Sequence, residues 1–183
     1  MHFLLRPPIL ALGFISLLTG LWGGLERIGW EFSVPDALPL QHGPLMISGF
    51  LGTLIGLERA VAVGSGWALG IPALTGLGAV GLVAGLPRTL VGAEFVLASA
   101  AMTAIPAWMF FRRGGVPLLI MAAGSASWLL GNILWMTGSA VVELVQWWAA
   151  LFNAAGIVLF LALVLYSLIG HATKRPRQPR APD

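Results

Sequence analysis

The stretch QHGPLMISGFLGTLIGLERAVAVG, residues 41–64, decides the fold of this chain. It is long and apolar enough to cross a bilayer, because a helix needs about 20 such residues to span the hydrocarbon core. A histidine, His42, stands at its start, and the adjacent residues Glu58 and Arg59 stand near its end. The stretch therefore predicts a membrane helix with polar groups at both ends.

The composition of the whole chain agrees with a membrane protein. Of its 183 residues, 58% are hydrophobic and 9% are charged, whereas soluble domains carry about 25% charged residues. The mean hydropathy is +0.91. The chain has no cysteine, which excludes disulfides, zinc–thiolate sites, iron–sulfur clusters and a thiol nucleophile.

Several further segments resemble this stretch in length and apolar character, so the sequence predicts an all-α, polytopic bundle of six transmembrane helices. They are expected at about 7–25, 43–63, 67–86, 89–111, 116–137 and 142–170. Pro7, Pro8, Pro44 and Pro117 fall near expected helix starts, where a proline in the first turn removes no hydrogen bond. Pro106 lies inside the fourth helix and is expected to kink it.

The distribution of charge predicts the orientation, since an even number of spans leaves both termini on one side. That side holds an almost purely basic set, which comprises Arg6, Arg59, Arg112, Arg113 and the tail from Lys174 to Arg180. The other side is mainly acidic and holds Glu26, Arg27, Glu31, Asp36, Arg88, Glu94 and Glu143. The positive-inside rule therefore predicts that both termini are cytoplasmic, in a bacterial-type inner membrane.

This layout divides the chain into two parts. Residues 1–170 are expected to form the transmembrane domain, and residues 171–183 a basic, disordered cytoplasmic tail beside the lipid surface. The tail has no aromatic residues and no fold of its own, so nucleic acid is not an expected partner. The expected partner is the lipid bilayer.

The first candidate site lies on one stripe of the second helix. At about 100° per residue, His42, Met46, Gly49 and Thr53 share a face. One interpretation is a packed neighbour, because the G-x-x-x-G spacing at 52–56 is typical of membrane helix interfaces. The other is a flat cofactor or a metal held by His42 with Met46, because imidazole and thioether suit haem iron and copper.

The second candidate site is the charged pair at the far end of the same helix. Glu58 and Arg59 lie about 24 Å beyond His42, near the inner edge of the core. Arg59 is expected to extend toward lipid phosphate. Glu58 points away from His42, so it either pairs with Arg112 or Arg113 or lines a polar path through the membrane.

Two asparagines fall within predicted spans, Asn132 in the fifth and Asn153 in the sixth. Ser125, Trp128 and Trp135 lie on the turns around Asn132. Amides in lipid need hydrogen-bond partners, so one interpretation is interhelical bonding, including a contact between the two asparagines. The other is a polar spot in a substrate cavity.

Residues 42–59, HGPLMISGFLGTLIGLER, resemble the H-x-x-x-x-x-G-F helix of NnrS-like membrane proteins, which are relatives of the haem–copper oxidase catalytic subunit. His42, Gly49 and Phe50 carry the resemblance. It implies a helical bundle that binds haem or copper through His42 and is linked to nitric oxide or oxygen chemistry. Those proteins use several membrane histidines, so here a bis-histidine haem would need a homodimer. The resemblance thus implies a cofactor-binding or accessory protein.

Three functions remain open from the sequence. The first is a small inner-membrane protein that binds haem, copper or another small ligand near the outer face, through His42, Met46, Gly49, Phe50 and Thr53. The second is a transporter or channel that uses Glu58, Arg59, Asn132 and Asn153. The repeat G-x-x-x-G-L-E-R at 20–27 and 52–59 also favours it, because inverted repeats occur in transporters. The third is an assembly subunit with glycine-rich partner-binding faces. No motif indicates an enzyme.

Overall fold

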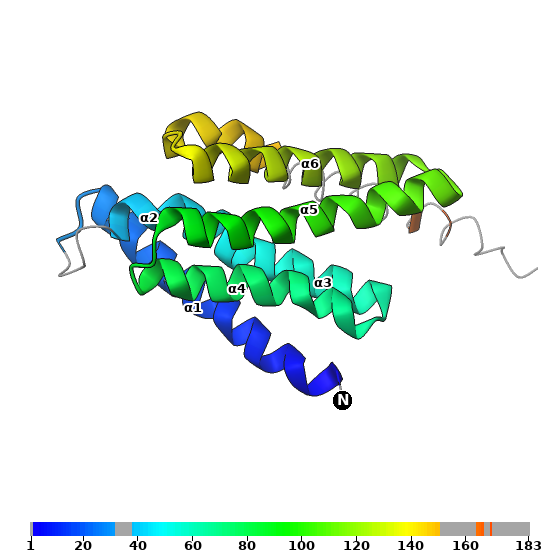
Figure 1. Cartoon of the computed structure of the whole chain (residues 1–183), viewed down its shortest axis with the longest axis horizontal. Coiled ribbons are helices and arrows are strands. Elements are labelled where there is room, and N and C mark those ends of the chain that lie inside the picture. Colours follow the sequence, from blue (N-terminus) through cyan, green and yellow to red (C-terminus); the bar gives the residue numbers. More distant parts are fainter. Residues whose placement is uncertain (1, 32–37, 151–163, 167–168, 170–183) are drawn as a thin grey trace, which may run out of the picture.

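The structure, a computed structural model, describes residues 2–31, 38–150, 164–166 and 169. These residues form helices and turns, with no strand among them, which confirms the all-α prediction. Figure 1 shows long helices lying side by side, with α5 and α6 along one side of the bundle and α1 crossing beneath α4.

Within the described residues, five helical segments are long and apolar enough to cross a membrane. They are α1 (Arg6–Arg27), the composite segment Leu38–Val63, the segment Gly66–Val83, α5 (Arg88–Arg113) and α6 (Val116–Thr137). The sixth predicted span, about 142–170, lies largely outside the described residues, although residues 141–150 are helical. The coarse prediction of a polytopic helical membrane protein is therefore confirmed.

Prolines and glycines mark several helix ends, and the sequence predicts the proline positions. Pro7 and Pro117 lie in the first turns of α1 and α6, where the missing N–H removes no intrahelical bond. Gly64 and Gly138 follow the ends of α3 (Gly52–Val63) and α6 with φ of 71° and 118°. Positive φ at this position is accessible to glycine at little cost, so it ends a helix cleanly.

The second span is not the uniform α-helix that the sequence predicts. It consists of α2 (Leu38–Pro44), the π-helix η2 (Leu45–Leu51) and α3. The expectation that Pro44 starts this helix is wrong, because the helix begins at Leu38 and Pro44 lies inside it. Proline lacks an N–H and crowds the carbonyl four residues earlier. The change to a wider turn follows directly after it.

Two hydroxyl groups support the π-helical turn. Ser16 Oγ donates to the carbonyl of Leu45 at 2.8 Å, and Thr53 Oγ1 donates to the carbonyl of Gly49 at 2.6 Å. Ser16, Gly49 and Thr53 are small residues. Small side chains let the α1 and η2 backbones lie close together. Two carbonyl groups of the turn therefore have hydroxyl partners in a region where lipid can provide none.

The third span combines a short 3-10 turn, η3 (Gly66–Leu69), with α4 (Gly70–Val83). Its glycines pack within the chain. A Cβ atom at Gly76 would lie 2.8 Å from Leu12 Cβ of α1, and one at Gly78 would lie 2.8 Å from the ring of Phe95 of α5. The glycine-rich surface of this span is thus partly used to hold the bundle itself together.

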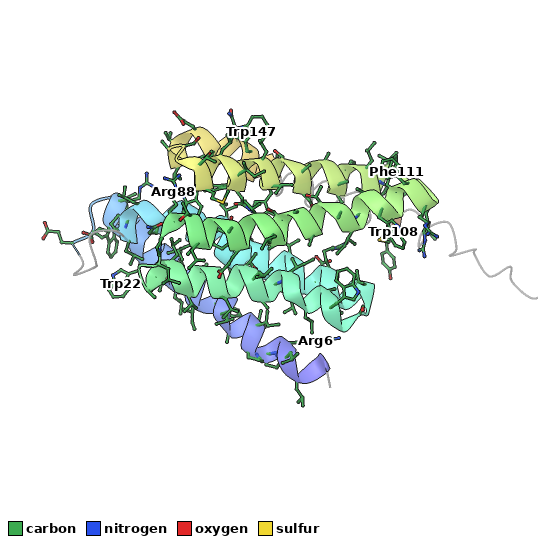
Figure 2. All side chains as sticks on the ribbon, in the orientation of Figure 1. Arg6, Trp22, Arg88, Trp108, Phe111 and Trp147 are labelled. Carbon is green, nitrogen blue, oxygen red and sulfur yellow. The ribbon has the colours of Figure 1, made fainter. Side chains whose placement is uncertain are left out.

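The charged residues divide between the two ends of the bundle. We call the end at which α1 begins and α3 and α5 finish the basic end, and it carries Arg6, Arg59, Arg112 and Arg113. Figure 2 shows Trp108 and Arg6 toward this end, and Trp22 and Arg88 toward the other. At the other end, Arg88 stacks on Trp135 at 5.0 Å and donates to the carbonyl of Ser139 at 2.6 Å.

Candidate functional site

A cleft of about 820 Å³ lies at the basic end, between α3, η3, α5 and α6. This volume is within the usual 300–1,000 Å³ range of sites for small molecules. Its walls are mainly apolar and carry two arginines. The described residues that line it are Arg59, Ala62, Val63, Trp67, Ala101, Met102, Ala104, Ile105, Pro106, Trp108, Met109, Arg113, Leu118 and Met121.

One face of α5 forms the longest wall of the cleft. Met102, Ile105, Met109 and Arg113 recur at intervals of three and four residues, which places them on the same side of a helix. Pro106 lies within this stretch and the helix continues through it. Methionine side chains are flexible and adapt to the shape of an apolar ligand. The wall is therefore apolar along its length and cationic at the basic end.

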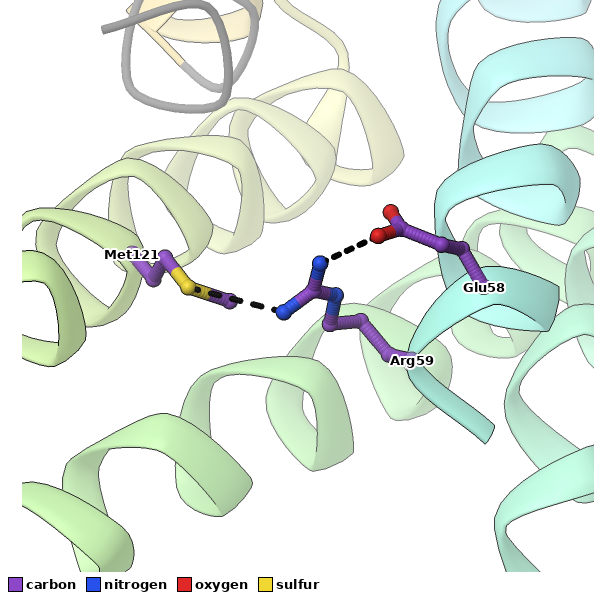
Figure 3. Close-up of polar contacts among 3 residues, drawn as sticks. All are labelled: Glu58, Arg59 and Met121. Atoms are coloured by element: carbon purple, nitrogen blue, oxygen red, sulfur yellow. Dashed lines mark hydrogen bonds and ion pairs between the residues drawn. The ribbon is translucent and has the colours of Figure 1, made fainter. Parts of the chain in front are cut away.

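Arg59 reaches from α3 across to α6. One guanidinium nitrogen donates to Glu58 Oε1 at 2.5 Å, and another lies 3.6 Å from the thioether sulfur of Met121 (Figure 3). Its side chain is 29% exposed and that of Glu58 is 63% exposed. The sequence offered Arg112 or Arg113 as partners of Glu58. The partner is instead Arg59, the next residue on the same helix.

The other two arginines of the basic end differ from each other. The guanidinium of Arg112 lies 5.1 Å from the ring centroid of Trp108, a cation–π distance. Arg113 lines the cleft. Arg59 pairs with Glu58, whereas no carboxylate among the described residues pairs with Arg113. The cleft thus carries net positive charge.

The predicted His42 stripe packs against α1. A Cβ atom at Gly24 would meet the His42 ring, one at Gly20 would lie 3.0 Å from Met46 Sδ, and one at Gly13 would lie 3.3 Å from Thr53 Cγ2. Gly49 similarly faces Ser16, and Phe50 lies 6.4 Å from Phe14 between ring centroids. The structure therefore brings these five predicted residues to one helix interface, where α1 fills the space beside the small ones.

His42 itself is held in a defined orientation. Its Nδ1 lies 2.7 Å from the carbonyl oxygen of Gly20. A carbonyl can only accept, so this bond requires the hydrogen on Nδ1 and leaves Nε2 as the ring nitrogen with a free lone pair. Ligating histidines are commonly oriented by such a bond. However, the described residues contain no group of three or more His, Cys, Asp or Glu side chains that could hold a metal.

Asn132 lies at the centre of a buried polar network. Its Oδ1 accepts from Ser48 Oγ at 2.7 Å and from Trp148 Nε1 at 3.2 Å, while its Nδ2 donates to Ser99 Oγ at 3.2 Å and to the carbonyl of Phe95 at 3.3 Å. Its side chain is 0% exposed. Both ends of the amide are satisfied, which is the interhelical role considered from the sequence. Asn153 lies outside the described residues.

The sequence identified Arg59 but missed the rest of the cleft. Arg113, Met121, Trp67 and Trp108 come from three separate segments, and only the packing of those segments brings them together. A signal was present in α5, where apolar residues at helical spacing lead to an arginine in the last turn. That pattern is common in membrane helices and does not identify a site by itself.

Comparison with known proteins places the chain in a family. No curated protein and no solved structure matches it. A family model described as "Domain of unknown function (DUF8744)" matches residues 6–165, which include all five membrane-length segments and the cleft. The chain belongs to this family, the DUF8744 family.

Proposed function

We propose that this protein is a small multi-pass membrane protein that binds one lipid-like amphiphile in the cleft at its basic end. The observation that carries the proposal is a cleft of about 820 Å³ with mainly apolar walls and two arginines among its lining residues. An apolar ligand body would bury the methionine and alanine surfaces. A polar head would lie beside the arginines.

The proposal includes the layout of the chain in the membrane. Six spans, with the last at about 142–170, and cytoplasmic termini would place the basic end at the inner face of a bacterial-type inner membrane. The ligand would then enter from the cytoplasmic leaflet. The composition of the basic end supports this orientation, because Arg6, Arg59, Arg112 and Arg113 all lie there.

Narrowing the cleft tests the proposal. Ala104 of α5 lines it and is exposed, so Ala104→Trp should fill part of the space. The matched control is Leu97→Trp, on the same helix at a position that is 60% exposed and outside the cleft lining. Protein extracted in mild detergent is analysed by native mass spectrometry for retained small molecules.

We expect the unmodified chain and Leu97→Trp to retain about one amphiphile per chain, and Ala104→Trp to lose most of it. Equal retention by all three proteins, or no retained molecule in the folded unmodified chain, would reject the cleft as a binding site. Thermal unfolding of each variant shows whether a loss of ligand merely reports a loss of structure.

A second ligand, haem or copper at His42, is favoured by one observation. The Nδ1 bond to Gly20 leaves Nε2 as the ring atom for ligation. Further ligands would have to come from a second copy of the chain or from a small molecule, because the described residues have no suitable cluster. Homodimer formation is therefore part of this second proposal.

A further inference from the structure

We infer that the ligand of the cleft is an anionic phospholipid whose phosphate is held by Arg113 with help from Arg59. This inference rests on the proposed function and adds the chemical class of the ligand. It starts from the charge balance of the cleft. Glu58 is engaged by Arg59, and Arg113 has no carboxylate partner among the described residues, so a ligand with a negative head compensates the remaining charge.

The position of Arg113 suits an anion at the membrane surface. It is the last residue of α5, where the helix carbonyls favour a cation. A planar guanidinium matches the oxygens of a phosphate in a two-bond geometry, which a point charge does not. Its neighbour Arg112 is occupied on the ring of Trp108. The two adjacent arginines therefore have different tasks, and Arg112 is a natural control.

Arg59 can supply a second contact from the opposite wall. One of its nitrogens has the sulfur of Met121 as partner, at 3.6 Å. A thioether is a weak acceptor, so a phosphate oxygen would be a better one. Donors from α3 and α5 then approach the same head from two directions, which a tetrahedral phosphate with several oxygens accommodates.

The apolar wall has the length of one acyl chain. From Met102 to Arg113 there are eleven residue steps, which correspond to about 16 Å along a helix at 1.5 Å per residue. One leaflet of the hydrocarbon core is about 15 Å thick, half of the roughly 30 Å total. A lipid with its phosphate at Arg113 would therefore reach the end of the wall with its chain. Free phosphate would leave the wall empty.

Nanodiscs of defined composition test this inference. The protein is placed in equal amounts of phosphatidylglycerol and phosphatidylcholine with identical chains, and diacylglycerol is added as a headless analogue. Lipids that remain bound after extraction are counted by native mass spectrometry. The same measurement is made on Arg113→Gln, on Arg112→Gln and in the presence of millimolar inorganic phosphate.

We expect phosphatidylglycerol to exceed phosphatidylcholine by about tenfold in the unmodified chain. Both lipids carry the phosphate, but the choline cation adds a positive charge beside the uncompensated arginine, and a repulsion of this kind near a protein surface reaches that scale. Arg113→Gln should reduce the preference to within twofold while some lipid stays bound, and Arg112→Gln should keep it. Equal retention of all three lipids would overturn the inference but leave the proposed function intact. Absence of any bound lipid would overturn both.

Two other outcomes also overturn the inference. An equal loss of preference in Arg112→Gln and Arg113→Gln would indicate attraction by the general positive surface. Displacement of the lipid by inorganic phosphate would identify a free anion as the ligand. Thermal unfolding checks that both variants stay folded. A loss of the headgroup contact alone should change the unfolding temperature by no more than a few degrees.

Discussion

The hydroxyl of Ser48 donates a hydrogen bond of 2.7 Å to Oδ1 of Asn132, a residue 84 positions later in the chain. Ser48 lies in the π-helical turn of the second span and Asn132 in α6. The indole of Trp128 in turn donates to Ser48 Oγ at 3.2 Å. A continuous set of buried hydrogen bonds thus links the irregular turn of one span to the centre of another.

Replacement of Asn132 should destabilise the protein markedly. Asn132→Leu removes four hydrogen bonds and leaves Ser48 and Trp148 without their acceptor. A buried unsatisfied group costs about 1–3 kcal/mol, so for the two donors we expect the free energy of unfolding to fall by about 2–6 kcal/mol. Thr137→Ala, on the same helix, should change it by less than about 0.5 kcal/mol. Unfolding in detergent measures both, and equal effects would contradict the network.

Alanine at Gly92 should be far more harmful than alanine at Gly70. A Cβ at Gly92 would lie 2.7 Å from Met136 Cβ and 3.2 Å from its Cα, whereas one at Gly70 meets nothing within 4 Å. Overpacking of this kind costs about 1–3 kcal/mol. Gly70→Ala should be neutral or slightly stabilising because alanine favours helix. Thermal unfolding of the two variants compares them, and a similar loss in both would argue against the α5–α6 packing.

The hydroxyls of Thr53 and Thr75 should be energetically coupled. They lie 2.9 Å apart and both residues are 0% exposed. Hydrogen bonds between membrane helices average about 0.6 kcal/mol in double-mutant cycles, with a maximum of about 1.7. We expect a coupling in this range from the cycle of Thr53→Val and Thr75→Val. Strict additivity of the two substitutions would show that the bond contributes nothing.

A ligand at His42 has a direct spectroscopic signature. If Nε2 binds haem or copper, the purified protein should show a Soret band or stoichiometric copper by elemental analysis, and His42→Ala should abolish it. Gln41→Ala, one residue away, should retain the signal. Well-folded protein that carries neither chromophore nor metal after expression with haem and copper supplied would reject this ligand.

The absence of cysteine makes the orientation measurable with single labels. Ser65→Cys lies at the basic end and Thr89→Cys at the opposite end. In intact cells a membrane-impermeant maleimide should label Thr89→Cys at once and Ser65→Cys only after the membrane is opened. The reverse labelling pattern would show that the chain has the opposite orientation, with the cleft at the outer face.

Regular spans were predictable because their information is local. The bounds of α6 agree with the expected 116–137, since Pro117 and Gly138 mark its ends by their own backbone preferences. The charged ends were equally visible. Each of these features depends on a few neighbouring residues and on the thickness of the bilayer, so no knowledge of tertiary packing was needed.

Irregular and long-range features were not predictable in this way. A 100° wheel assumes one helical period, so it cannot show that residues 45–51 turn more slowly. The helical wheel still placed His42 and Met46 on one face, because His42 precedes the turn and Met46 lies at its start. It could not show that α1 covers both residues. The sequence indicated Arg113 only as a basic residue of the cytoplasmic side and as a possible partner of Glu58. The cleft that it lines brings Met109, Arg59 and Met121 together from three separate spans.

The π-helical turn also changes how this segment tolerates insertions and deletions. A π-turn holds about one residue more than an α-turn over a similar rise, so deleting one residue between Leu45 and Leu51 would restore a continuous α-helix of nearly equal length. The span would still cross the membrane. The half of the span before the turn would keep nearly the same rotational position, because the wider turn already absorbs the extra residue, and His42 would still meet Gly24. A deletion within the regular helix α3 would instead rotate that half by about 100°, and a different set of side chains, without His42, would meet Gly20 and Gly24.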